Sequence, residues 1–392
     1  MKPASDLKLL PRADRRVRLG HAWVFSNEVD VAKTALTEFS PGDLAVVRDS
    51  YNKPVGLAYV NPGSLICARM LTSNVRAEID GAWWRSRIER AFALREAIYP
   101  TPHYRAVYGE SDGCPGLVVD RYGDVLVAQL NTAGIVKMRE DIVTALQDIA
   151  KPRGVLLRSA GSVRQIEGIE AFDEAVGNVP DYAEVVEDNA SFMAPLRAGQ
   201  KTGYFYDQRD NRSRLARYVR GKSVLDMYSY IGSWGIRAAK FGATHVTCAD
   251  SSEIALAAAQ DNAQRNATPV ATIKGDAPEI LQALAAEGRS FDVVIVDPPA
   301  LIKRRKDAAA GAQLYAKLNR LALAVLKTNG TLIACSCSHH LEPEALQRAL
   351  LSAGKDAGRR LQILERHAHA PDHPVHPAMP ETEYLKAFFV RA

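Results

Sequence analysis

The sequence predicts an α/β fold whose C-terminal half is built on a seven-stranded, mostly parallel sheet. From about residue 200, short apolar runs of strand length alternate with longer stretches rich in Ala and Leu, which is the pattern of a parallel sheet covered by helices on both faces. Glycine or acidic residues directly follow several of these runs. The N-terminal part instead has short apolar runs separated by Pro, Gly and Asn, which is typical of a small β-rich module.

The chain has 392 residues, which is longer than one hydrophobic core usually organises. Length alone predicts two or three domains, and the change of pattern along the chain indicates three: a β-rich domain over 1–72, a small α+β domain over 73–196 and an α/β domain over 197–392. Apolar residues at helical spacing predict a helix over 79–98 in the middle domain. A hairpin and a second helix over 134–149 follow it.

Seven apolar runs make up the predicted sheet of the C-terminal domain. The predicted strands are 223–226, 245–250, 268–274, 291–297, 330–336, 361–366 and 384–390. In an open parallel sheet, ligands bind beyond the carboxyl ends of the strands. The residues that follow these strands are therefore the first candidates for a functional site.

Composition sets the broad class of the protein. Hydrophobic residues make up 47% of the chain, and the net charge of +5 is compatible with a polyanionic partner without requiring one. The five cysteines are scattered and lack the spacing of a disulfide framework or a zinc site, so we expect reduced thiols. No signal-peptide or membrane-spanning segment is evident, so we expect a cytoplasmic protein without a membrane partner.

The turns after four successive strands are chemically distinctive. The first contains Gly232 and Gly235, which let the backbone approach a ligand without a Cβ in the way. Asp250 ends the second strand, where a carboxylate can accept hydrogen bonds from ribose hydroxyls, and Asp276 and Asp297 follow the third and fourth. Each acid alone fits a helix cap, but together they predict a nucleoside ligand. The missing G-x-G-x-x-G disfavours a nicotinamide dehydrogenase.

Several segments carry a family resemblance. In the C-terminal domain they are VLDMYSYIGSWGI, CADSS, KGDA, FDVVIVDPPALIK, LIACSCS and DHPVHPAMPETEYLKAFF. They closely resemble the bacterial 23S ribosomal RNA large-subunit methyltransferase I family, whose members form 5-methylcytosine. The segment QKTGYFYDQRDNR over 200–212 matches a long motif of that family, and RRVRLGHAWVFSNEV with PGDLAVVRD resembles its PUA domain.

The resemblance implies a class I Rossmann-like methyltransferase domain behind a PUA-like RNA-binding domain and an α+β middle domain. It also implies S-adenosyl-L-methionine as cofactor and 23S ribosomal RNA as partner, and it leaves open whether the chain is a monomer or a homodimer. The cofactor-binding residues that it implies are Gln200, Thr202, Gln208, Tyr228, Ser229, Gly232, Asp250, Ser251, Asp276 and Asp297.

The resemblance also assigns roles within this set. Tyr228, Ser229 and Gly232 would surround the methionine part of the cofactor. Asp250 would hold the ribose and Asp276 would face the adenine amino group. Asp297 would border the transferred methyl group, and the 200–209 segment would close over the same pocket.

Methylation of cytosine carbon 5 requires a thiolate that adds to carbon 6, because carbon 5 alone is a poor nucleophile. Cys335 and Cys337 share one side of a predicted strand, so alternation does not choose between them. Cys337 lies nearer the carboxyl end and matches the cysteine of the family's S-C-S segment, so we assign it as the nucleophile and read Cys335 as core packing. The base that removes the carbon 5 proton is Asp297 or Glu383, and the sequence does not decide between them.

Three arginine and lysine clusters are candidates for RNA contacts. One includes Arg15 and Arg16, and another follows the Asp-Pro-Pro turn with Lys303, Arg304 and Arg305. The third is a run of arginines over 209–220 on a predicted helix. A histidine group over 367–376 lacks the partner spacing of a metal site, so we expect no metal.

Two other functions remain open. Methylation of a different RNA base atom needs no thiol, and a Cys337→Ser variant with full activity would favour it. A non-catalytic RNA-binding assembly factor could keep the same fold, and a failure to bind S-adenosylmethionine would favour that reading.

Overall fold

The computed structural model describes residues 5–159 and 163–392, which form two compact units. The first unit contains the described residues up to Ala183 together with Pro195–Tyr204 and Pro371–Thr382. The second contains Glu184–Ala194, Phe205–Ala370 and Glu383–Ala392. Within the described part of the chain, each helix is too short or too polar to cross a lipid bilayer.

The first sheet of the first unit has five strands in the order β1-β3-β4-β5-β2. Its strands are β1 (Ser5–Lys8), β2 (Trp23–Phe25), β3 (Asp43–Arg48), β4 (Pro54–Val60) and β5 (Ile66–Thr72). β1 pairs with β3 in parallel and the other pairs are antiparallel. With the short helix α1 (Asp14–Arg18), this sheet encloses its own apolar core. The predicted β-rich character of this segment is confirmed.

The second sheet of the first unit also has five strands, in the order β10-β9-β8-β7-β6. They are β6 (His103–Tyr108), β7 (Leu117–Tyr122), β8 (Val125–Leu130), β9 (Gly154–Ser159) and β10 (Phe172–Gly177). The helices are α2 (Gly81–Ile98), α3 (Ala133–Lys137), α4 (Arg139–Ala150) and α5 (Val163–Glu167). The predicted hairpin is β7 with β8.

Both helices predicted for the middle segment are present. α2 begins two residues later than predicted because Asp80 caps it, accepting a hydrogen bond from the Trp83 amide. The second predicted helix is divided into α3 and α4 at Met138. Trp84 and Phe92 of α2 are buried in a core shared with the second sheet.

The second unit contains the predicted seven-stranded sheet, in the order β15-β14-β13-β16-β17-β19-β18. Its strands are β13 (Ser223–Met227), β14 (His245–Asp250), β15 (Ala271–Lys274), β16 (Phe291–Val296), β17 (Leu326–Ser336), β18 (Gln362–His367) and β19 (Lys386–Arg391). Neighbours from β15 to β17 are parallel, whereas β19 is antiparallel to both β17 and β18. A separate hairpin consists of β11 (Tyr182–Glu187) and β12 (Ala190–Pro195).

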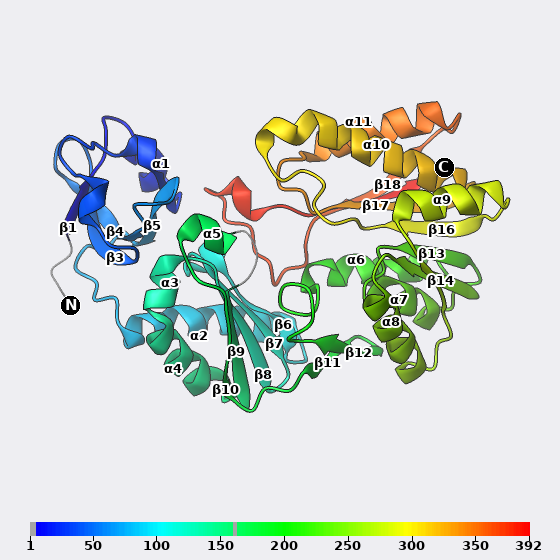
Figure 1. The fold of residues 1–392 in the computed structure, drawn as a ribbon, viewed down its shortest axis with the longest axis horizontal. Helices are drawn as coiled ribbons and strands as arrows, with labels where there is room; N and C mark the ends of the chain where they lie inside the picture. The colour runs from blue at the N-terminus through cyan, green and yellow to red at the C-terminus, as the bar shows by residue number, and fades with distance from the viewer. Residues whose placement is uncertain (1–4, 160–162) are drawn as a thin grey trace. The chain divides into compact units, whose positions relative to one another are not determined.

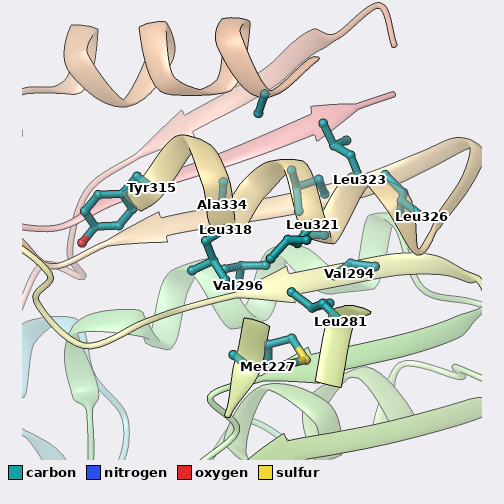
Figure 2. Close-up of a cluster of buried hydrophobic side chains, with 14 of the residues drawn as sticks. Met227, Leu281, Val294, Val296, Tyr315, Leu318, Leu321, Leu323, Leu326 and Ala334 are labelled. Atoms are coloured by element: carbon teal, nitrogen blue, oxygen red, sulfur yellow. The ribbon is translucent and has the colours of Figure 1, made fainter. Parts of the chain in front are cut away.

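Helices cover both faces of this sheet (Figure 1). They are α6 (Arg209–Arg214), α7 (Ser233–Lys240), α8 (Glu253–Arg265), α9 (Ala277–Ala286), α10 (Ala308–Ala324) and α11 (Pro343–Asp356). Val294 and Val296 of β16 pack on one face with side chains of α9, α10 and α11 (Figure 2). Val293 and Ile295 pack on the other face with Trp234 of α7. This alternation along one strand confirms the doubly covered sheet.

Candidate active site

The turn after β13 has an unusual backbone. Tyr228 and Tyr230 have φ angles of 63° and 49°, and Gly232 has a φ of 80°. Left-handed backbone is unfavourable for a residue with a Cβ, so it persists where surrounding contacts hold it, often at functional sites. Here the Ser229 amide donates to the Ala249 carbonyl oxygen at 3.1 Å, which ties the turn to the end of β14.

Gly235 serves packing in this structure. A Cβ at Gly235 would lie 2.6 Å from Cys248 Sγ and 3.1 Å from Val246 Cγ1. The glycine therefore lets α7 approach β14 closely. Our prediction that both glycines of the turn make room for a ligand is wrong for Gly235, because the space it leaves is filled by β14.

A pocket of about 250 Å³ opens at the carboxyl edge of β13, β14 and β15. It is lined by Met227, Tyr228, Ala249, Asp250, Ser251, Gly275, Asp276, Ala277, Pro278 and Glu279. Four predicted cofactor residues, Tyr228, Asp250, Ser251 and Asp276, are therefore brought together. Asp250 is fixed at the rim, since its two carboxylate oxygens accept from the amides of Ser252 at 2.9 Å and Tyr230 at 3.0 Å.

Asp276 occupies the N-cap position of α9, but its side chain makes no capping hydrogen bond. It is exposed and lines the pocket. Helix capping by its side chain therefore does not explain this acid. Burial and the carboxylates of Asp276 and Asp250 raise the pKa of Tyr228 to about 12, so its hydroxyl stays protonated. The pocket thus offers two carboxylate acceptors and a hydroxyl, which fits the ribose and amino groups of a nucleoside.

Asp226 is a buried carboxyl group that the sequence analysis did not select as a site residue. Its Oδ2 accepts from the Gly235 amide at 2.9 Å, and its Oδ1 has no hydrogen-bond partner in the described part of the chain. Burial raises the pKa of Asp226 to about 8. Its only signal in the sequence was an acid inside an apolar strand, where burial of a carboxylate costs free energy.

Asp297 lies at the carboxyl end of β16, between two hydrogen-bond donors. Gln208 Nε2 and Trp234 Nε1 each donate to its Oδ2 at 3.0 Å. Burial raises the pKa of Asp297 to about 6. The structure therefore brings Gln208 and Asp297 together as expected from the sequence, while Trp234 is a partner that sequence reasoning missed.

Cys337 directly follows β17, the strand next to β16, and its thiol donates to the Pro298 carbonyl oxygen at 3.6 Å. Pro298 follows Asp297, so the thiol lies against the turn that carries this carboxyl group. Cys337 is partly exposed, whereas Cys335 and the other three cysteines are buried. Cys335 thus packs in the core as predicted.

Residues 166–391 match the family of S-adenosylmethionine-dependent methyltransferases, and residues 7–73 match the family of PUA-like domains. A curated relative from Deinococcus radiodurans, named ribosomal RNA large subunit methyltransferase, is 35% identical over 99% of this chain and 98% of its own. One from Shewanella denitrificans, named ribosomal RNA large subunit methyltransferase I, is 34% identical over 99% of both chains. The chain belongs to the ribosomal RNA large subunit methyltransferase I family.

Solved structures agree with this family's fold. A methyltransferase from Streptococcus mutans superimposes with a TM-score of 0.84 at 19% identity, over 99% of this chain and 100% of its own. Another methyltransferase, solved with SAH, gives a TM-score of 0.85 with the same identity and coverage. The family is S-adenosylmethionine-dependent, and the pocket beside Asp250 and Asp276 fits the nucleoside part of that cofactor.

The remaining predicted site residues of this methyltransferase are not among those that line the pocket. Gln200 is exposed, and the Thr202 hydroxyl donates to Asp120 Oδ2 at 2.5 Å; both residues lie in the first unit, so their cofactor role stays a prediction. Ser229 is buried, and its Oγ has no partner among the described residues. Glu383 is exposed.

The predicted RNA-contact residues differ in whether they are exposed and whether an acidic side chain pairs with their charge. Lys303, Arg304 and Arg305 are exposed in the loop after the Asp-Pro-Pro turn, with Arg304 paired to Asp307 at 3.0 Å. Arg15 is exposed. Arg16 instead donates to both carboxylate oxygens of its own unit's Glu28, at 2.9 Å and 3.0 Å, so it stabilises the N-terminal sheet region.

The arginine run over 209–220 is partly internal: Arg209 and Arg212 are buried, so the prediction of an RNA-binding cluster is wrong for these two, whereas Arg217 and Arg220 are exposed and their role stays a prediction. Arg212 is buried in a bidentate pair with Glu187, at 2.9 Å and 2.6 Å. Arg214 and Arg217 both pair with Glu365, at 2.8 Å and 3.0 Å. These carboxylates come from segments distant in sequence, so helical spacing alone gave no sign of them.

Proposed function

We propose that this enzyme methylates carbon 5 of a cytosine in 23S ribosomal RNA, with Cys337 as a covalent nucleophile. The relatives named as large-subunit ribosomal RNA methyltransferases support the RNA class, because they match nearly the whole chain. A PUA-like domain at the N-terminus and a net charge of +5 suit an RNA partner.

The position of Cys337 is the observation that carries this proposal. A nucleophile must reach the base and must lie beside the methyl donor. Cys337 is the partly exposed cysteine, it lies at the carboxyl edge of the sheet, and its thiol contacts the turn of Asp297. Core packing does not explain a cysteine at this partly exposed position, because Cys335 on the same segment already fills the core.

The chemistry divides between the cofactor and the chain. S-adenosylmethionine, when bound, supplies an electrophilic methyl group. The Cys337 thiolate adds to carbon 6 of the cytosine, which makes carbon 5 nucleophilic. Once carbon 5 carries the methyl group, a base removes its proton, the carbon–sulfur bond breaks and the thiolate leaves. Because the cytosine must be unstacked to reach the sulfur, the substrate is a single-stranded or extruded nucleotide.

For the base that removes the carbon 5 proton, we propose Asp297 over Glu383. Burial raises the pKa of Asp297 to about 6, close to the operating pH where a general base is most effective. Gln208 and Trp234 both bind Oδ2 of this carboxylate, which orients it. Glu383 is exposed to solvent and lacks this orientation.

The proposal is tested with RNA that contains 5-fluorocytosine. Fluorine at carbon 5 cannot leave as a proton does, so the adduct persists and migrates as a protein–RNA complex on a denaturing gel. We expect the wild-type enzyme and the Cys335→Ala control to form this complex in the presence of S-adenosylmethionine, and Cys337→Ser to form none. Full methyl transfer by Cys337→Ser would instead favour a target atom that needs no thiol.

The product and its site are tested in cells. Bisulfite sequencing of 23S ribosomal RNA from cells with and without this protein should differ at a cytosine that is protected from conversion when the protein is present. Restoration by the wild-type gene and not by Cys337→Ser would assign the modification to this thiol. Identical conversion patterns in both strains would contradict the proposal.

A further inference from the structure

A lysine ammonium is buried beside the segment that carries Cys337. Lys386 begins β19 and is 5% exposed. Its Nζ donates to the carbonyl oxygens of Ser338 at 2.7 Å and Tyr384 at 2.8 Å. Lysine is rarely buried without a carboxylate, because removing an ammonium from water is costly. Packing alone gives no reason to keep a cation at this position.

Ser338 connects this lysine to Cys337, its neighbour in the chain. The Ser338 carbonyl accepts from Lys386, and its hydroxyl lies 2.8 Å from the Tyr315 hydroxyl and accepts from the Ile302 amide at 3.1 Å. Its amide donates to the hydroxyl two residues earlier at 3.2 Å. All three polar groups of Ser338 are therefore bonded, which fixes the backbone of Cys337 relative to the ammonium.

The acids near Lys386 are exposed to solvent. Burial lowers the pKa of Lys386 to about 8, while Cys337, Glu342 and Glu383 act in the opposite direction. Both glutamates are exposed, and Glu342 lies at the N-cap of α11. Solvent screens these carboxylates more than it screens a buried charge. With a pKa of about 8, Lys386 keeps its proton at neutral pH.

Two further titratable groups that act on the Cys337 thiol carry no positive charge. Tyr315 on α10 and Cys335 on β17 lie within electrostatic reach of its thiol, and burial raises the pKa of both. Asp297, at the end of β16, acts on Cys335. Among these groups, Lys386 is the one that can favour a negative charge on the sulfur.

The geometry points to Lys386 as a positioning residue whose ammonium holds the Cys337 sulfur as a thiolate, ready to attack the pyrimidine. This inference deepens the proposed function and rests on it. The step breaks the S–H bond and with it the weak hydrogen bond from the thiol to the Pro298 carbonyl oxygen: the proton goes to solvent, and the ammonium keeps its own protons. An opposite charge nearby favours the charged form of a thiol. The attacking sulfur is thus ionised before the RNA arrives.

The test measures alkylation of Cys337 by iodoacetamide as a function of pH, followed by mass spectrometry of the modified peptide. Only the thiolate reacts, so the midpoint of the rate profile gives its ionisation. The other four cysteines are buried, and Cys337→Ser identifies any background from them. We expect the wild-type midpoint to lie below the ~8.5 of an ordinary thiol.

Two substitutions separate charge from packing. Lys386→Met keeps the length of the side chain without its charge, and we expect the midpoint to rise by about one pH unit or more, with an about tenfold slower reaction at neutral pH. Lys386→Arg keeps the charge and should retain most of the low midpoint. Circular dichroism and thermal unfolding confirm that each variant is folded.

The inference is overturned by a wild-type midpoint at or above ~8.5, which needs no variant. An unchanged midpoint in folded Lys386→Met overturns it as well. Should Lys386→Met fail to fold, Lys386→Gln replaces it and is judged in the same way. Because this readout uses neither RNA nor cofactor, it is independent of the product: a low, lysine-dependent midpoint without an RNA adduct would contradict the proposed function and leave this inference intact.

Discussion

At the scale of single residues, burial decides what each carboxyl group can do. Asp250 and Asp276 lie at the pocket and offer acceptors to a ligand, while Asp297 has a pKa of about 6 and suits proton transfer. Asp226 is fully enclosed and has a pKa of about 8. These four acids lie on or directly after the first four predicted strands, yet their environments give them different properties.

Asp226 should make the stability of the fold depend on pH. In the unfolded chain it ionises near pH ~3.9, so between that value and about 8 the folded protein holds a proton that the unfolded chain has released. Stability from this group therefore falls as pH rises through the window. Between pH 6 and 7.5 we expect the free energy of unfolding, measured in urea, to fall by about 2 kcal/mol more for the wild type than for Asp226→Asn. An exposed control, Asp261→Asn, should keep the wild-type dependence.

Asp276 should contribute to cofactor affinity. It lines the pocket without capping α9, so its carboxylate can bind a donor on the ligand. Loss of one hydrogen bond to a charged group costs about 1.5–3 kcal/mol, so Asp276→Asn should weaken S-adenosylhomocysteine binding at least about tenfold in calorimetry. Asp261→Asn on α8 should bind as the wild type does. Equal affinities for both variants would remove Asp276 from the site.

At the scale of elements, the positions of the strands in the sequence were predictable, but the order in which they pair in the sheet was not. The predicted runs agree with β13 to β19 because alternation and β-branched residues mark each strand locally. The insertion of β19 between β17 and β18 depends on long-range pairing, which no single run encodes. The same limit explains the errors at the site. Lys386 and Trp234 act through partners far away in sequence, and the arginines before β13 pair with distant carboxylates.

The loop between β16 and α10 should bind RNA phosphates. Lys303 and Arg305 are exposed there, beside the turn of Asp297. Each phosphate contact with a single strand contributes about 0.7 to the slope of log affinity against log salt. The double variant Lys303→Gln/Arg305→Gln should therefore bind a ribosomal RNA fragment more weakly and lower that slope by up to about 1.4 in fluorescence anisotropy.

A matched control is available at the opposite edge of the sheet. α11 begins near the carboxyl edge, after β17, and runs toward the opposite edge of the sheet. Lys355 and Arg360 lie near the C-terminal end of this helix and are exposed. The double variant Lys355→Gln/Arg360→Gln removes the same charge. An equal loss of salt dependence in both double variants would mean that net charge, and not this loop, holds the RNA.

At the scale of the whole molecule, the chain passes between the two units repeatedly, after Ala183, Ala194, Tyr204, Ala370 and Thr382. The segment Glu184–Ala194, which the sequence analysis assigned to the middle domain, lies in the second unit. Its residue Glu187 holds Arg212 in a buried bidentate pair and also lies 3.6 Å from Arg237. The domain limits at 1–72, 73–196 and 197–392 stay a prediction.

Fragments test how much the methyltransferase domain depends on that hairpin. A fragment over 180–392 keeps Glu187, whereas one over 197–392 leaves Arg212 and Arg237 buried without their carboxylate. Breaking a buried pair in this way costs about 3–5 kcal/mol. We therefore expect the shorter fragment to unfold at lower denaturant concentration or to be insoluble. Equal stability of the two fragments would contradict the importance of this pair.

The place of β19 affects how the protein is made. β19 (Lys386–Arg391) comes after β17 and β18 in the sequence, yet it lies between them in the sheet and is hydrogen-bonded to both. A ribosome therefore synthesises both partner strands before β19, and the sheet stays open between them until β19 has been made. Nascent chains and products of premature termination therefore present two unpaired strand edges, which invite aggregation or chaperone binding. The sheet of this methyltransferase is therefore complete, and Lys386 reaches its place beside Ser338, only after all seven strands have been synthesised.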